Sequence, residues 1–188
     1  DRYARQGVLP MIYFDNIARY VRDGGAVPIA AGPDYASPSS IWRTPLDAIL
    51  PAEPSGDITE EPFSPSLTEA GKRHPVTRGL EGSQSNPPHW SRWFRLVDTK
   101  NNNGTSVMQG PDGKPLLILA HEGQGRVALL LSDHIWLWAR GYEGGGPQID
   151  LLRRLSHWLM KQPELEEEAL RLIVKGHDIS VRRQTMAD

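Results

Sequence analysis

A helix pattern, a double glycine and a short apolar run at residues 14–31 limit the fold more than any other feature of the sequence. Apolar side chains recur with the spacing of one helix face at Phe14, Ile17, Ala18 and Val21. Gly24-Gly25 predicts the end of that helix, because glycine adopts a left-handed cap without steric cost. The run Ala26 to Ala31 is typical of a buried strand. This order is half of a βαβ unit and predicts an α/β fold.

Pro28 lies inside the predicted strand. Proline has no backbone N–H and cannot donate to a neighbouring strand, so interior strands rarely contain it. We therefore expect this strand to be bulged or to lie near an edge of the sheet.

The segment from Ser106 to Leu159 carries the clearest further elements. Ser106–Gln109 and Leu116–Ala120, joined by Pro111-Asp112-Gly113-Lys114, predict a β-hairpin. Val127–Leu131 is the most apolar run of the chain and predicts a central strand. Pro147 opens an amphipathic helix, for which we expect these buried positions: Ile149, Leu151, Leu152, Leu155, Trp158 and Leu159.

Between Gly32 and Ser106 the sequence is rich in proline, serine, glycine and asparagine, which favours a long connection. Thr44-Pro45 has the residues of a helix start, and a short helix is expected through Leu50. Trp90, Trp93 and Phe94, beside Arg92 and Arg95, are expected to anchor this connection to the core.

Composition excludes several classes of protein. The 188 residues include no cysteine, which removes disulfides, thiolate metal ligands and every cysteine nucleophile. A formal charge of −2 is unlike the basic footprint of a nucleic-acid binder. No apolar run reaches the ~20 residues of a membrane span. The six histidines lack metal-ligand spacing, so we expect neither a metal nor another cofactor.

Three groups of residues are candidates for a site. Ser132-Asp133-His134 follows the most apolar strand, where α/β proteins commonly place function, although adjacent residues cannot form a catalytic triad among themselves. The loop Gly141–Gly146 precedes a helix and suits either an anion cradle or a flexible connection, with Glu143 opposing an anion. Trp136, Trp138 and Arg140 alternate, so on an extended segment they share one face and line a groove or pack under the loop.

Several stretches together resemble a known family. They are Gly24–Asp34, Thr44-Pro45-Leu46, Leu50-Pro51, His74-Pro75-Val76-Thr77, Pro115-Leu116-Leu117, Gly123–Val127, Ser132–Trp138 and His157-Trp158-Leu159. In order and spacing they resemble the glutamine amidotransferase-like domain of large, membrane-anchored bacterial proteins, and they span roughly residues 1–162.

The resemblance implies a flavodoxin-like three-layer α/β/α fold related to class I glutamine amidotransferases, here with a β-hairpin insertion and a C-terminal extension. It implies that Asp1 follows a strand and that the earliest βα units lie upstream. Active relatives use an elbow cysteine with a His and a Glu two residues apart. Here Gly32-Pro33 stands at the expected elbow, and Trp136 rather than Glu follows His134 by two positions. No catalytic residue is therefore carried over.

We expect a non-catalytic module that binds or scaffolds other domains of its parent protein and envelope proteins. The expected contact surface is Asp34, Tyr35, Asp133, His134, Trp136, Arg140, Gly144 and Gly145. Two alternatives stay open. One is a hydrolase of another class that uses Ser132 or Asp34 with His134, and the other is a structural spacer.

Two domains are expected, an amidotransferase-like domain over 1–162 and an extension over 163–188 that opens a β-rich domain. Glu164–Arg171 is charged and helix-prone, and Ile173–Arg183 predicts one or two strands. The resemblance places the domain in an inner-membrane-anchored bacterial protein without deciding the side of the membrane. Nucleic acid and direct membrane insertion are not expected, and the sequence does not fix an oligomeric state.

Overall fold

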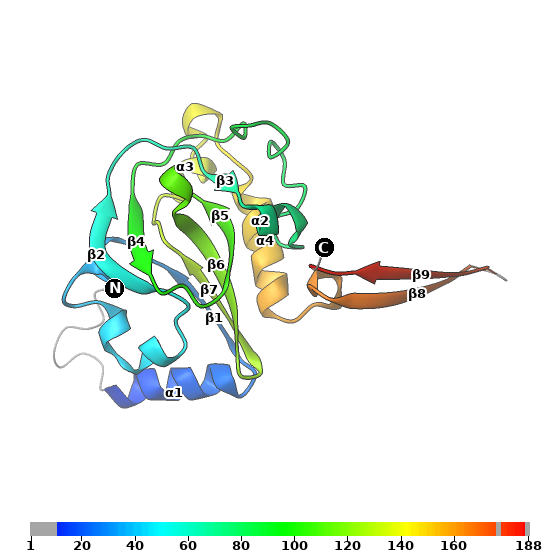
Figure 1. The fold of residues 1–188 in the computed structure, drawn as a ribbon, viewed down its shortest axis with the longest axis horizontal. Helices are drawn as coiled ribbons and strands as arrows, with labels where there is room; N and C mark the ends of the chain where they lie inside the picture. Colours follow the sequence, from blue (N-terminus) through cyan, green and yellow to red (C-terminus); the bar gives the residue numbers. More distant parts are fainter. Residues whose placement is uncertain (1–10, 176–177, 187–188) are drawn as a thin grey trace.

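The computed structural model describes residues 11–175 and 178–186, and it has a mixed α/β architecture (Figure 1). The helices are α1 (Met11–Arg22), α2 (Glu69–Arg73), α3 (Trp136–Ala139) and α4 (Gln148–Leu159). The strands are β1 (Ala26–Ala30), β2 (Glu53–Thr59), β3 (Ser66–Leu67), β4 (Leu96–Lys100), β5 (Thr105–Gln109), β6 (Pro115–Glu122), β7 (Gly125–Leu130), β8 (Ala169–Lys175) and β9 (Asp178–Gln184). Short 3-10 helices include η2 (Pro33–Ala36), η4 (Pro45–Ala48) and η7 (Pro163–Leu165).

One five-stranded sheet, in the order β1-β7-β6-β5-β3, forms the centre of the fold. β1 runs parallel to β7, whereas each of the other neighbouring pairs is antiparallel. The predicted hairpin is confirmed as β5 and β6, and every residue of β7 is buried. The sheet is therefore mixed, and the α/β prediction holds at that level.

The helix predicted over residues 14–21 is α1, and it buries Phe14, Ala18 and Val21 against β7. Gly24, with φ of +114°, ends it in a backbone region that other residues rarely adopt. Ile17 was expected in the same buried face, but 38% of its surface is exposed.

The prediction that β1 is buried was wrong, because its residues are half-buried or exposed. Its only partner among the described strands is β7, so it forms one edge of the sheet. The edge position expected from Pro28 is confirmed, and the register between β1 and β7 runs without a bulge.

α4 begins after Pro147 as expected and buries Leu151, Leu155, Trp158 and Leu159. Two positions predicted as buried are not. Ile149 is 82% exposed and Leu152 is 39% exposed.

The predicted long connection contains more regular structure than expected, because β2 and β4 pair as a second small sheet and α2 lies between them in sequence. The short helix at Thr44 is confirmed as η4, with Thr44 Oγ1 accepting a hydrogen bond from the Leu46 N–H. The anchoring role of the tryptophans is confirmed, since Trp90 and Trp93 pack on Trp138 with ring centroids 5.3 and 5.0 Å apart.

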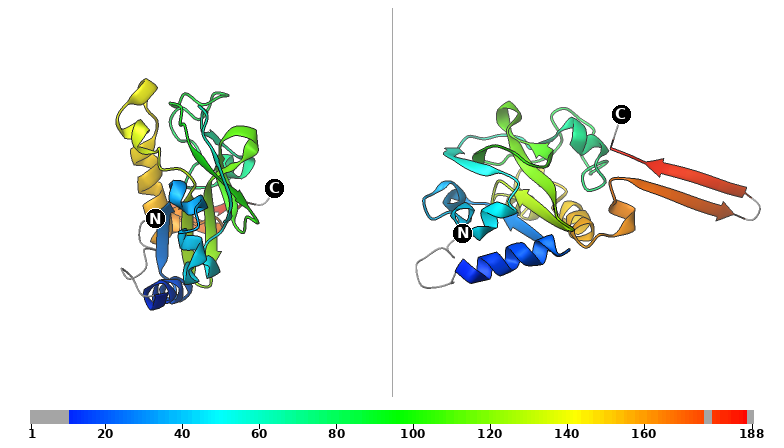
Figure 2. Two further views of the ribbon diagram at one scale, coloured as in Figure 1. Left: turned by 90° about the vertical axis from the view of Figure 1, so that its left-hand side faces the viewer. Right: turned by 60° about the horizontal axis from the view of Figure 1, so that its bottom comes forward.

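The C-terminal extension is a hairpin of β8 and β9 that projects from the body of the fold (Figures 1 and 2). The helical tendency of Glu164–Arg171 did not predict the structure correctly, because a single 3-10 turn, η7, is followed by non-helical chain and then by β8. The expected position of Asp1 after a strand lies outside the described residues. Among the described residues no helix is long and apolar enough to cross a membrane.

Candidate functional site

The parallel strands β1 and β7 end side by side, and the chain that follows them carries the predicted polar residues. β1 leads through Gly32 into η2, and β7 leads into Ser132-Asp133-His134. A Cβ atom on Gly32 would lie 3.5 Å from Asp133 Oδ2, so the two strand ends meet there. We call the surface formed by Gly32, Asp133, His134, Phe94 and Arg95 the crest.

Ser132 is fully buried and its hydroxyl is committed to the backbone. Ser132 Oγ donates to the carbonyl oxygen of Arg95 at 2.7 Å and accepts from the backbone N–H of His134 at 3.2 Å. The recorded bond thus involves the His134 backbone rather than its imidazole. The hydroxyl holds the turn after β7 against the segment that leads into β4.

The His134 ring is also held by a hydrogen bond to the backbone. Its Nδ1 accepts a hydrogen bond from the Phe94 N–H at 3.1 Å, and the two rings meet edge to face with centroids 6.3 Å apart. Burial lowers the pKa of His134 below its ordinary 6.5, with Asp133 opposing and Arg95 reinforcing that shift. A neutral imidazole is consistent with Nδ1 as an acceptor.

Asp133 is the crest residue with unused hydrogen-bonding capacity. Its Oδ2 lies 3.4 Å from Arg95 Nη1, while Arg95 Nε lies 3.3 Å from Glu60. Its Oδ1 is buried and has no hydrogen-bond partner among the described residues, and His134 Nε2 lies 3.8 Å from it. A buried carboxylate oxygen without a donor is costly, so this atom is suited to accept a hydrogen bond from a ligand or a solvent molecule.

The glycine loop is held by contacts to Ser91 and Arg92, in the segment that leads to the crest residues Phe94 and Arg95. Arg92 forms a two-point ion pair with Glu143, with Nε 3.0 Å from Oε2, and lowers the pKa of Glu143 to about 2. The Ser91 N–H donates to the carbonyl oxygen of Gly145 at 2.8 Å. With Glu143 held at its centre, this loop is a poor cradle for an anion.

The predicted surface is only partly assembled. Trp136 and Arg140 are exposed, Trp136 by 52%, and Gly144 is exposed while Gly145 is buried. Asp34 lies half-buried in η2 near the end of β1. No contact between Asp34 and His134 is recorded.

Tyr35 was wrongly placed on this surface. It is fully buried, and its hydroxyl donates to the carbonyl oxygen of Ala52 at 2.7 Å. Burial raises the pKa of this phenol. Tyr35 is a core residue that fastens η2 to the start of β2.

The prediction that Trp136 and Trp138 share one face was also wrong. Residues 136–139 form the one-turn helix α3, so Trp138 turns inward and is 3% exposed while Trp136 faces outward. Trp138 Nε1 donates to the carbonyl oxygen of Ser91 at 3.2 Å. A single helical turn is too short to reveal its period in sequence.

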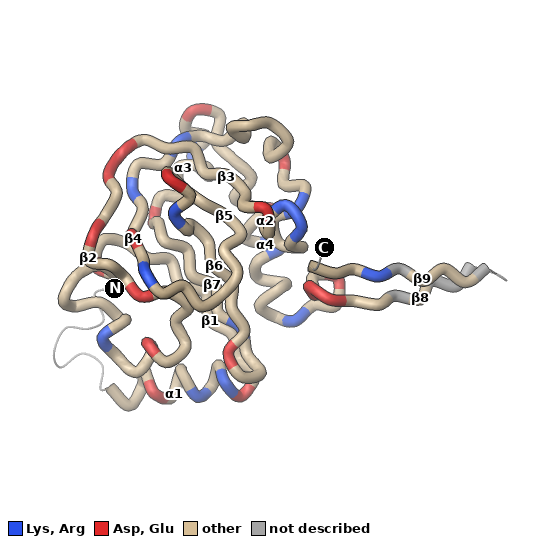
Figure 3. The backbone as a smooth tube through the Cα atoms, viewed as in Figure 1, with Lys and Arg blue, Asp and Glu red and all other residues tan. Residues whose placement is uncertain are grey.

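A second polar cluster was missed from sequence because its members are far apart in the chain. Glu167 accepts from Trp158 Nε1 at 3.2 Å and lies 3.0 Å from His74 Nε2 and 3.2 Å from His121 Nε2. Next to it, Glu166 pairs with the buried Arg126 at 2.7 Å. We call these six residues the hairpin anchor. Figure 3 shows acidic residues at the base of the hairpin.

The hairpin anchor fixes the extension to the body of the fold. The hydrogen bond with the His74 side chain is the largest cause that lowers the pKa of Glu167 to about 2, and His121 makes a smaller contribution. His74 is fully buried and stacks edge to face on Trp158. The described residues contain no group of three or more His, Asp or Glu side chains suited to a metal ion.

Comparisons with known proteins give a fold and no family. No protein-family model matches the sequence, and no curated protein matches it. Two solved structures from Salmonella typhimurium, each described only as a cytoplasmic protein, match 78% of this chain with TM-scores of 0.64 and 0.55 at 18% and 19% identity. The chain spans 59% and 60% of their lengths. A β-galactosidase from Rahnella sp. R3 matches with a TM-score of 0.54 at 16% identity, over 97% of this chain and 26% of the enzyme.

Proposed function

We propose that this chain is a non-catalytic, glutamine amidotransferase-like module that binds other proteins through the crest and the adjacent α3. The observation that carries the proposal is the use of Ser132 and His134. Ser132 Oγ and His134 Nδ1 are both engaged in backbone hydrogen bonds, whereas the Trp136 and Arg140 side chains are exposed to a partner.

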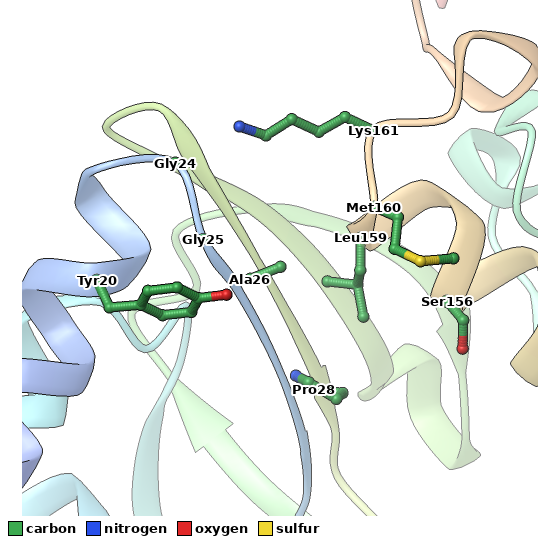
Figure 4. A pocket seen from close by; sticks show the side chains of 9 residues that line it. All are labelled: Tyr20, Gly24, Gly25, Ala26, Pro28, Ser156, Leu159, Met160 and Lys161. Atoms are coloured by element: carbon green, nitrogen blue, oxygen red, sulfur yellow. The ribbon is translucent and has the colours of Figure 1, made fainter.

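The finer fold assignment is part of this proposal. A flavodoxin-like three-layer arrangement is supported by the parallel pair β1 and β7 and by the places of α1 and α4 on either side of β1 (Figure 4). β5 and β6 then correspond to the hairpin insertion. Gly32, which is extended, and Pro33, which opens η2, occupy the strand-to-helix turn where the related enzymes carry their cysteine.

The hydrolase alternative has no geometric support in the described residues. A nucleophilic serine needs its hydroxyl within hydrogen-bond reach of a base, and the recorded partners of Ser132 Oγ are two backbone groups. The likeness to a β-galactosidase is at the level of the fold and does not transmit that activity.

The binding proposal favours protein partners over a small molecule. An exposed tryptophan beside an arginine is typical of the anchors of protein interfaces. We propose as partners other domains of a membrane-anchored bacterial parent protein, or envelope proteins close to it.

Two measurements test this function. We expect the chain to hydrolyse neither L-glutamine nor p-nitrophenyl acetate above the rate in buffer. Turnover that disappears in both Asp133→Asn and His134→Gln would sink the non-catalytic assignment.

The second measurement compares the proteins that co-purify with the chain from bacterial extracts. We expect Trp136→Ala/Arg140→Ala to lose partners that the control Leu170→Ala retains, because Leu170 is 74% exposed and lies on the projecting hairpin. Equal retention by both variants would favour the spacer alternative.

A further inference from the structure

The sequence predictions of burial failed at several positions on three neighbouring elements, β1, α1 and α4. β1, Ile17, Ile149 and Leu152 were all expected to be buried and are exposed or half-exposed. β1 is the edge strand, and the three side chains belong to the helices α1 and α4 that lie on either side of it (Figure 4). The apolar pattern of the sequence therefore includes side chains on α1, β1 and α4 that the described residues leave exposed.

Both helices carry a second apolar stripe besides the buried one. In α1 it consists of Tyr13, Ile17 and Tyr20, which are 53%, 38% and 62% exposed. In α4 it runs along Ile149, Leu152, Ser156 and Met160, and the apolar members are 82%, 39% and 61% exposed. Each set follows helical spacing, so it lies along one line of its helix.

The ends of the two stripes face each other across β1. A groove of about 460 Å³ is lined by Tyr20 of α1, by Ala26 and Pro28 of β1, and by Ser156 and Met160 of the α4 end. Figure 4 shows Tyr20 on one side of the strand and the α4 residues on the other. Ala26 and Pro28 of the exposed β1 edge thus form the floor of a groove whose walls combine apolar groups of Tyr20, Leu159 and Met160 with the polar Ser156 and Lys161.

The backbone of β1 specifies what can fill this groove. The Arg126 N–H donates to the carbonyl of Gly25 at 3.1 Å, and the Ala31 N–H donates to the carbonyl of Leu130 at 2.7 Å. In a parallel ladder alternate residues face the same neighbour, so odd-numbered residues from 25 to 31 face β7. The backbone groups of Ala26, Pro28 and Ala30 then face outward, toward the groove.

Pro28 makes a second copy of this chain a poor occupant. Antiparallel pairing of β1 with itself about a twofold axis at residue 28 would place two prolines opposite each other, and both central N–H donors would be missing. A different strand loses only one hydrogen bond at this position. Pro28 therefore disfavours pairing of this edge with a second copy and leaves the edge open to a different strand.

We propose that the β1 edge binds an extended strand from outside residues 1–188, with apolar side chains on both of its faces. One face of that strand packs on the α1 stripe and the other on the α4 stripe, while its backbone pairs with Ala26, Pro28 and Ala30. This mode is β-strand addition, in which main-chain bonds give affinity and flanking side chains give specificity. It concerns a different surface from the crest and does not depend on the function proposed there.

The test supplies such a strand by fusion. A short strand of Val, Ile and Thr is joined ahead of residue 1 through a Gly/Ser linker, which raises its local concentration to about the millimolar range. We expect the Ala26 and Ala30 amides to exchange hydrogen about tenfold more slowly in the fused chain, while Val27 and Ile29, which already face β7, change little. The matched control carries the same strand interrupted by proline.

Two variants check the walls of the groove. Tyr20→Ser and Met160→Ser remove exposed apolar groups, so the fused strand should protect Ala26 and Ala30 less in both. Leu170→Ser, on the distant hairpin, should leave the protection unchanged.

Two results would overturn the proposal. One is unchanged exchange at Ala26 and Ala30 in the fused chain. The other is concentration-dependent protection of those amides in the unfused chain, which would make a second copy the occupant. In Pro28→Val, by contrast, we expect self-association in sedimentation, because the missing donor is restored.

Discussion

Glu167→Gln is the substitution that most directly tests how the C-terminal extension is held. The Glu167 carboxylate accepts from Trp158 Nε1 and lies within 3.2 Å of the His74 and His121 side chains. Only 26% of this side chain is exposed, so solvent weakens these interactions less than at an open surface. Glutamine keeps the shape of the side chain and removes its charge.

The magnitude follows from the pKa of this carboxyl. Its fall from 4.5 to about 2 corresponds to a ceiling of about 3 kcal/mol in favour of the folded state. Because a lowered pKa stabilises the ionised form, this contribution is complete above about pH 4.5 and is lost as the pH falls toward about 2. Glutamine still offers one carbonyl oxygen, so we expect Glu167→Gln to cost about 1–3 kcal/mol at pH 7.

The assay is urea unfolding followed by tryptophan fluorescence at several pH values between 7 and 3. Glu168→Gln is the matched control, because Glu168 is exposed and accepts hydrogen bonds from Thr185 and Met186, which follow β9. The reasoning would be refuted if Glu167→Gln matched this control within about 0.5 kcal/mol at pH 7. It would also be refuted if the cost of Glu167→Gln stayed constant down to pH 3.

Three further predictions concern the core, a close backbone contact and the crest. Trp138→Ala should lower the free energy of unfolding by about 3–5 kcal/mol in urea titrations, because this ring is 3% exposed, while Trp136→Ala should stay within about 0.5 kcal/mol. Gly125→Ala should cost about 1–3 kcal/mol in the same assay, since its Cβ would lie 1.8 Å from a backbone oxygen of α1, whereas Gly32→Ala meets nothing closer than 3.5 Å. The His134 ring should titrate below pH 6.5 by NMR, and part of the stability of the wild-type chain should be lost as the pH falls from about 6.5 through that pKa; His134→Gln should lack this part. A His134 pKa above 6.5 would contradict the burial of that ring. Equal costs of Gly125→Ala and Gly32→Ala would contradict the close approach of α1 to Gly125. A Trp138→Ala variant as stable as the wild type would contradict the core position of that ring.

Elements with a strong local signal could be predicted from the sequence. The α1 period, the hairpin of β5 and β6 and the buried β7 depend on residues that are neighbours in the chain, so their pattern is visible there. Pro28 even indicated the edge position of β1. The extended chain after η7 was mistaken for helix, because its run of glutamates has high helix propensity and its partners lie elsewhere in the fold.

The position of the candidate site at the end of β7 could be read from the sequence, but its contacts could not. Asp133 and His134 do follow β7, and their role as a site stays a prediction based on the function that gathers at such strand ends. Their partners Phe94 and Arg95 come from a segment about 40 residues earlier, and sequence reasoning had treated that segment only as a loop anchor. Tyr35 shows the opposite error, because it follows Asp34 in a loop-rich stretch while its hydroxyl donates to a carbonyl in the buried core.

The two proposed binding surfaces are connected through a single strand. β1 forms the floor of the groove and continues directly into Gly32, which approaches Asp133 at the crest. An added strand that extended past Ala30 would approach Gly32 and would exclude water from around Asp133. Covering a carboxylate strengthens its interactions with nearby cations, because less water screens them. We therefore expect such a strand to strengthen the pairing between Asp133 and Arg95.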